Sequence, residues 1–234
     1  MKQTRGYINR ILLILMPLLF MSVGMANDIY VTQSGDTLDL DITQDGQNNT
    51  VGNSTTSSSS VGATTTLNID QLGNSNVITY AINGATYTGV INLVGNSNNV
   101  DLNCDSTGGN SSCGTANAVI NFTGSSNDID LDIGQTSSAA TADVDIVGQS
   151  GSDSNVVAAT VDGNSAILTI TVNGDTNNWL IDIDGNGDVN GHTLIHTHTG
   201  GIADVDIVQS GINDQYINLT TSGDNHDIDI SQTD

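Results

Sequence analysis

Four oxygen-bearing side chains in the C-terminal third of the chain have the spacing of a calcium-binding loop. The segment 182–188, which reads DIDGNGD, matches the start of the pattern D-x-D-x-N-G-x that wraps oxygen ligands around a hard cation. The full pattern continues to a bidentate Glu at its twelfth position, where this chain has Thr193. The alternative is an acidic strand that ends in a glycine turn. The candidate Ca²⁺ ligands are Asp182, Asp184, Asn186 and Asp188.

Three histidines follow this segment at even-numbered positions, His192, His196 and His198. In a strand these side chains share one face, where imidazoles can meet a transition metal. Counting from Gly191 places them on the same face as Leu194, whereas Ile195 favours the opposite register. The alternative to a metal site is a group of histidines that respond to pH without a ligand.

Enzyme motifs are missing from the sequence. It contains no G-x-S-x-G elbow, no phosphate-binding loop, and no Cys–His pair with a third member. Aspartates occur in pairs, but a glycosidase needs one carboxyl group in a sheltered pocket, and these pairs belong to a repetitive open pattern. The sequence therefore predicts a protein that is not an enzyme and requires no cofactor, with Ca²⁺ as the one candidate ion.

The charged residues are very unevenly distributed. The formal net charge is -23, all acids are Asp, and the only cations are Lys2, Arg5 and Arg10. After residue 26 the chain has no Lys, Arg, Glu, Met or Pro, which excludes a helical bundle because most strong helix formers are missing. Nucleic-acid binding is excluded as well, because no cation is left to contact phosphate.

The first 26 residues have the pattern of a secretory signal peptide. The three cations form a basic region, Ile11–Phe20 an apolar region, and Gly24–Ala26 a small-residue cleavage site. The apolar run is too short to span a bilayer comfortably. We expect cleavage after Ala26, which leaves a secreted domain of residues 27–234 without a membrane span. In an exported protein the two cysteines, Cys104 and Cys113, are expected to form a local disulfide.

Glycines recur at a regular interval through this secreted domain. The steps are eleven residues within each of two early sets and ten to twelve near the C-terminus. Between glycines the residues alternate with period two, as in Leu38, Leu40 and Ile42 on one face and Asp39 and Asp41 on the other. The early sets are Gly35 and Gly46, then Gly62, Gly73, Gly84 and Gly95.

Such a unit cannot bury its apolar face alone, but a stack of units can. The sequence therefore predicts an all-β solenoid, or β-helix, of about seven two-strand rungs made from 11-residue half-repeats. An antiparallel sandwich is the alternative, since it also alternates. The constant period favours the solenoid.

Two segments resemble the Q-x-G-x-x-N core of curlin repeats. They are Gln44–Asn49 (QDGQNN) and Gln71–Asn76 (QLGNSN), while Gln33–Gly35 and Gln209–Gly211 keep the first half and Gly95–Asn98 and Gly174–Asn177 keep the second. Curlins are secreted subunits of curli, bacterial amyloid fibres with a β-solenoid fold that support biofilm and adhesion. The resemblance implies self-assembly at the bacterial cell surface, with a nucleator subunit and an outer-membrane secretion channel as partners. The polar leader that directs curlins to this channel is missing here.

Inward amides at matching heights are expected to form ladders, as in-register stacked strands do. Neither terminal strand carries Pro or Lys to block further pairing, so we expect end-to-end growth into amyloid-type fibres. Because stacked aspartates repel, assembly should be favoured by low pH, salt or divalent ions. The alternatives are a monomeric or partner-dependent acidic solenoid that acts as a Ca²⁺-dependent adhesin or an ice-binding module, or a minor nucleating subunit of a fibre. The expected ladder residues are Gln33, Gln44, Gln71, Asn49, Asn76, Asn98, Asn127, Asn177 and Gln209.

Overall fold

The computed structural model describes most of the domain that follows the expected signal peptide. The described residues are 27–46, 48–52, 55, 57–73, 75–104, 113–134, 141–149, 151–163, 165–184, 192–211 and 215–233. Residues 1–26, to which the signal peptide was assigned, lie outside this part of the chain.

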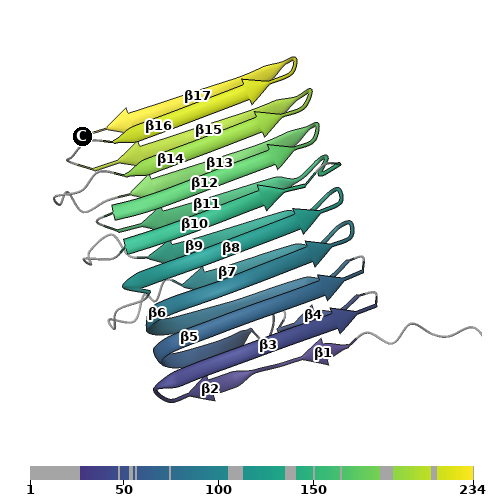
Figure 1. Cartoon of the computed structure of the whole chain (residues 1–234), viewed down its shortest axis with the longest axis vertical. Coiled ribbons are helices and arrows are strands. Elements are labelled where there is room, and N and C mark those ends of the chain that lie inside the picture. Colours follow the sequence, from purple (N-terminus) through teal and green to yellow (C-terminus); the bar gives the residue numbers. More distant parts are fainter. Residues whose placement is uncertain are drawn as a thin grey trace, which may run out of the picture.

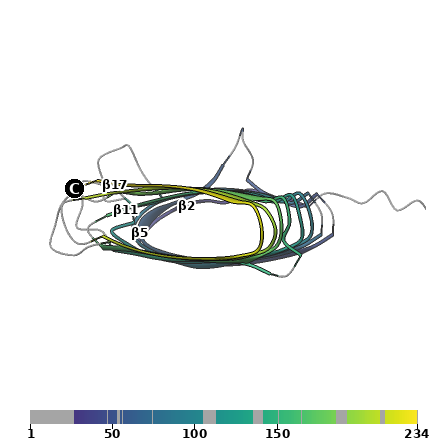
Figure 2. The ribbon, with the colours of Figure 1, turned by 90° about the horizontal axis from the view of Figure 1, so that it is seen from above.

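The described chain is an all-β solenoid of about seven turns, which confirms the predicted fold class. All of its strand pairs are parallel, and strands of successive turns lie side by side along the stack (Figure 1). Viewed along the stack, each turn is a flattened oval with strands along its two long sides (Figure 2). The two sides are called face A and face B below.

The long strands β5 (Ser58–Leu72) and β6 (Val77–Val94) bend around one corner and contribute to both faces. Face A otherwise contains β1 (Asp28–Ile29), β2 (Thr32–Ser34), β4 (Thr50–Val51), β7 (Asn99–Cys104), β9 (Asp128–Gly134), β11 (Val156–Asp162), β13 (Asn177–Asp184), β15 (Ala203–Ser210) and β17 (His226–Thr233). Face B otherwise contains β3 (Thr37–Asp45), β8 (Thr115–Thr123), β10 (Thr141–Gly148), β12 (Ser165–Asn173), β14 (Thr193–Thr199) and β16 (Tyr216–Ser222).

The length of one turn follows the predicted half-repeats. Residues 22 positions apart lie side by side at several steps, as in Val77 beside Asn99 and Val156 beside Asn178. Elsewhere the offset is larger, up to 29 residues at the step from Asn99 to Asp128. The extra residues fall between β4 and β5, β7 and β8, β9 and β10, β10 and β11, and β13 and β14, and the strands on either side of them stay in register.

Alternate side chains of each strand point into a narrow core between the two faces. Trp179 and Ile181 of β13 are fully buried, while their neighbours Asn178 and Leu180 are exposed. This agrees with the inward positions that the glycine count predicts. One core column contains an isoleucine from each of six successive strands of face B, at positions 42, 69, 91, 120, 146 and 170. Stacking identical apolar groups removes each from water without mismatch in shape.

Chain reversal from face B to face A uses a four-residue turn of the form Gly-x-x-Asn. At Gly124 the backbone has a φ of 116°, and a Cβ atom there would lie 2.1 Å from the carbonyl oxygen of Gly95 in the turn beside it. Only glycine fits both requirements. The third turn residue is also left-handed, as at Ser126 with a φ of 60°, and the fourth residue, Asn127, points inward.

Candidate functional site

The most regular polar feature of the core is a ladder of asparagines at these turns. Six asparagine side chains stack above one another, one from each of six successive turns, and all are buried. From Asn98 onward, each carboxamide oxygen accepts hydrogen bonds from the backbone N–H and from Nδ2 of the asparagine in the preceding turn. Asn76 Oδ1 accepts from the Asn49 N–H alone, and Asn49 Nδ2 has no partner among the described residues. The members are Asn49, Asn76, Asn98, Asn127, Asn155 and Asn177.

The geometry at Asn127 illustrates how completely these groups are paired. Its Oδ1 accepts from the Asn98 N–H at 3.1 Å and from Asn98 Nδ2 at 2.9 Å. Its own Nδ2 donates to the Gly124 carbonyl at 2.9 Å and to Asn155 Oδ1 at 3.0 Å. A buried amide with all its groups paired is stabilising, whereas an unpaired one costs about 1–3 kcal/mol.

The structure adds one member to the expected ladder and marks its end. Asn155 was missed because Ser152 occupies the place of the turn glycine, so a count that starts at Gly151 is one residue out of phase. Beyond Asn177 the same position is occupied by Ala203 and then by His226.

The expected glutamines do not join a single ladder. Gln71 Nε2 donates to Gln44 Oε1 at 2.7 Å, but the next turn places Leu93 in that column. Gln209 lies on face A, where it accepts from Gln232 Nε2 at 2.9 Å. Gln33 lies in β2 beside Ser60 of β5, away from the other three.

Outward aspartates are interspersed with amides along the stack. Asn68 Nδ2 donates to Asp41 at 2.7 Å, and Asn92 Nδ2 donates to Asp70 at 2.6 Å. These pairs separate carboxylates that would otherwise repel each other at the strand spacing of about 4.8 Å. Where aspartates stack directly, the effect is visible in the pKa of Asp130, which is raised by burial and then by the charges of Asp101 and Asp128.

The candidate calcium loop lies mostly outside the described residues. Asp182 is a half-buried outward residue of β13, and the backbone of Asp184 ends that strand. The side chain of Asp184, together with Asn186 and Asp188, falls in the part that the structure leaves undescribed. Ca²⁺ binding at these four residues therefore remains a prediction.

The histidines point into the core, in the register set by Gly191 and Leu194. His192 Nδ1 accepts a hydrogen bond from the Ala166 N–H at 3.2 Å. His196 and His198 are fully buried in β14, and their ring nitrogens have no hydrogen-bond partner among the described residues. Ile195 is the outward residue between them.

Burial controls the protonation of these rings. It lowers the pKa of His196 from 6.5 to about 4, with a smaller contribution from the neighbouring His198. The pKa of His198 is lowered by burial and then by His226, while Asp175 opposes the shift. Within the described residues, no group of three or more His, Cys, Asp or Glu side chains could hold a metal ion.

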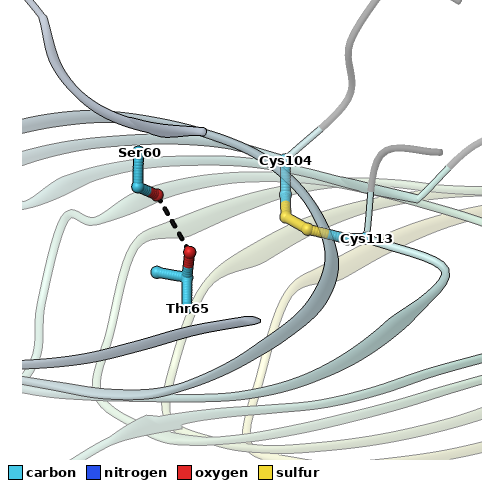
Figure 3. The surroundings of a disulfide bond; sticks show 4 residues. All are labelled: Ser60, Thr65, Cys104 and Cys113. Carbon is cyan, nitrogen blue, oxygen red and sulfur yellow. Dashed lines mark hydrogen bonds between the residues drawn. A yellow bond between two sulfur atoms is a disulfide. The ribbon is translucent and has the colours of Figure 1, made fainter. Parts of the chain in front are cut away.

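A disulfide joins Cys104 and Cys113, whose Cα atoms are 5.9 Å apart. Both residues are buried, and they lie at the two ends of the segment 105–112 (Figure 3). In the preceding turn, β6 continues around this corner without a break. In the turn of the disulfide, β7 ends at Cys104 and β8 begins at Thr115. The bond therefore closes the corner where the strand is interrupted. In the same view Ser60 and Thr65 close the corner of β5 with a hydrogen bond of 3.0 Å.

Both ends of the described stack have unpaired strand edges. Strands β1 and β3 pair only with later strands, and β16 and β17 only with earlier ones. Inward side chains at these ends are only partly buried, among them Leu40 of β3 and Ile217 of β16. Ile230 of β17 is 48 % exposed. Such edges are templates for pairing with another chain.

The register connects the two ends column by column. Leu40 heads a column that passes through Leu67, Ala118 and Leu168 and ends at Ile217. In the same way the isoleucine column that includes Ile42 leads through His196 to Leu219. On face A, the column of Ile29 ends at Ile228.

The structure also brings together threonines that the sequence pattern leaves scattered. Thr171 of β12, Thr197 of β14 and Thr220 of β16 form one outward column on face B. The threonine pair Thr169 and Thr171 is visible in the sequence, but the column depends on the strand register.

Comparison of the chain with protein-family models, with curated proteins and with solved structures finds no match. Within the described residues, no helix is both long enough and apolar enough to cross a membrane.

Proposed function

We propose that the chain is a secreted, curlin-like subunit that assembles end to end into extracellular amyloid-type fibres, with a structural or adhesive role in a bacterial biofilm. The observation that carries this proposal is the match between the two open ends of the solenoid. Placing β3 of a second copy one strand spacing beyond β16 continues the columns of the first copy.

The core columns remain apolar across such a junction. Leu40 of the incoming copy would stack on Ile217, and its Ile42 on Leu219. On face A, its Ile29 would stack on Ile228. Each of these side chains is less buried than its counterparts inside the stack, apart from Ile42, which is 5 % exposed. Burial of this surface favours addition.

The outward residues at the junction give both attraction and repulsion. Asp41 of the incoming copy would lie beside Asn218, which repeats the hydrogen-bonded pair that Asp41 already makes with Asn68. Asp28 would lie beside Asp227, which is a like-charge pair. Addition of a copy is therefore favourable in its core and sensitive to ions at its rim.

The contact uses different surfaces on the two copies, so it does not close on itself and leads to a filament. Backbone pairing at each new edge recreates the same edge for the next copy. Growth by strand addition of this kind needs no template other than the solenoid end.

The test is incubation of purified protein, residues 27–234, with thioflavin T fluorescence followed over time and electron microscopy of the end point. Fibres whose growth is accelerated by preformed fibres are expected. A β-rich protein that stays monomeric, with or without added fibres of the same chain, would contradict the proposal. A matched control replaces Ile217 and Leu219 with Lys, which places charge in the junction columns at the last face B strand.

A further inference from the structure

The two faces of the C-terminal half differ sharply in charge. Strands β12, β14 and β16 on face B contain no acidic residue. The face A strands to which they are connected carry the outward aspartates Asp162, Asp182, Asp204, Asp206, Asp227 and Asp229. In a chain with a formal net charge of -23, this half of face B is an uncharged surface. It is called the neutral face below.

The neutral face presents β-branched and aromatic side chains in straight columns. Tyr216 is 56 % exposed and Ile167 is 40 % exposed, with Thr193 between them. The other two columns lie beside this one on the same strands. They consist of Thr169, Ile195 and Asn218, and of Thr171, Thr197 and Thr220.

We propose that the neutral face packs against the neutral face of a second copy, so that the fibre consists of two solenoid stacks side by side. This inference rests on the proposed function, because it concerns how the filament is built. Any second copy carries the same negative charge, and burying a carboxylate without a cation is costly. The neutral face allows two copies to approach without that cost.

The chemistry of the columns fits a dry contact between sheets. Threonine and isoleucine methyl groups interdigitate, and threonine hydroxyls pair with one another at the strand spacing, as in the interfaces between paired sheets of stacked strands. The Tyr216 ring adds a large apolar surface in the same column as Ile167, with Thr193 between them. Carboxylates on the neutral face would prevent this contact. The outward aspartates of β13, β15 and β17 show that the fold accommodates such side chains on face A.

The neutral face of one copy is too small to hold two unassembled copies together. Three strands at about 4.8 Å spacing and about 23 Å length give about 300 Å² per copy. A stable protein–protein contact buries about 800 Å² on each partner. In a filament the same contact repeats in every copy, so many weak contacts act together. Pairing should therefore follow filament growth.

The test compares two variants that add the same charge to opposite faces. Ile195→Asp with Thr197→Asp gives β14 the Asp-x-Asp pattern, and its neighbours on β12 and β16 are uncharged. The control, Asn178→Asp with Leu180→Asp, adds the same pattern to β13 on face A, beside Asp204 and Asp206. The measurement is the mass per unit length of fibres by dark-field electron microscopy.

Wild-type and control fibres are expected to contain two copies per solenoid length, and the β14 variant one, a two-fold drop with fibre growth retained. Wild-type fibres with a single copy per solenoid length, or a β14 variant that keeps two, would overturn the pairing and leave the proposed function intact. Failure of the wild-type chain to form any fibre would overturn the proposed function and the pairing with it. Inhibition of ice recrystallisation by the unassembled protein, lost in the β14 variant alone, would assign this face to ice and overturn pairing.

Discussion

The rings of Trp179 and His196 meet edge to face in the core, with their centroids 5.3 Å apart. His196 continues the isoleucine column of face B, between Ile170 and Leu219. Burial favours the neutral form of an imidazole in this position, and no described group accepts a hydrogen bond from its ring nitrogens. The solenoid is therefore sensitive to pH at its C-terminal turns.

The first prediction follows from the pKa of His196, which burial lowers from 6.5 to about 4. Between these values the unfolded chain binds a proton that the folded chain does not, so the free energy of unfolding falls as the pH falls from 6.5 to 4. The full effect is about 3 kcal/mol at 1.36 kcal/mol for each pKa unit. Urea unfolding of the unassembled protein, measured on both sides of this window, tests the prediction.

The matched variant for this experiment is His196→Leu, which restores an apolar residue to the column. It should lose much of the pH dependence between 6.5 and 4, although His198, whose pKa is also lowered, keeps part of it. A wild-type chain whose stability is constant across this window would contradict the assignment of a buried neutral imidazole.

The second prediction concerns the asparagine ladder. Asn127→Ala removes the acceptor of two hydrogen bonds and leaves the backbone N–H and Nδ2 of Asn98 unpaired on that side. The expected loss is about 2–4 kcal/mol in the free energy of unfolding, since buried groups lose their partners. Asn117→Ala is the control, because Asn117 is an exposed outward residue of β8. Equal stability of the two variants would mean that the ladder does not contribute.

Much of the fold could be predicted because the glycine period and the alternation describe the same unit. The inward position of Asn177 follows directly from the count that starts at Gly174. The position of Asn155 does not, since a serine replaces the turn glycine there. For His196 the alternation alone was ambiguous, because Ile195 is apolar but points outward; pairing with Ile170 decides the register.

The surfaces that involve several turns could not be predicted from the same count. The offset between neighbouring turns varies from 22 to 29 residues, because different numbers of residues separate successive strands. The meeting of Thr171 with Thr197, or the correspondence of Leu40 with Ile217, depends on every intervening offset. These relationships need the register of the whole stack.

The third prediction tests the junction between copies with a pair of compensating changes. Asn218→Asp places a carboxylate beside Asp41 of the next copy, so elongation should slow several-fold at low salt. Adding Asp41→Asn to the same chain should restore the rate, because one carboxylate again faces one amide. Seeded thioflavin T kinetics measure both variants. If elongation of the double variant stays as slow as that of Asn218→Asp alone, the defect lies outside this contact.

The last prediction concerns the ions that surround the aspartates. The carboxylates of Asp28 and Asp227 repel each other across each junction, and Asp101 repels Asp130 within the stack. Salt screens this repulsion and divalent cations bridge it, so both should shorten the lag before fibres appear. Calcium should shorten the lag at a lower concentration than sodium does. EDTA should reverse the effect of calcium but not the effect of sodium. Acidification to about pH 4 protonates part of the carboxylates and should also shorten the lag, since their usual pKa values lie near 3.9. Equal lag times with EDTA at about pH 8 and at about pH 4 would contradict a role for the acidic residues in assembly.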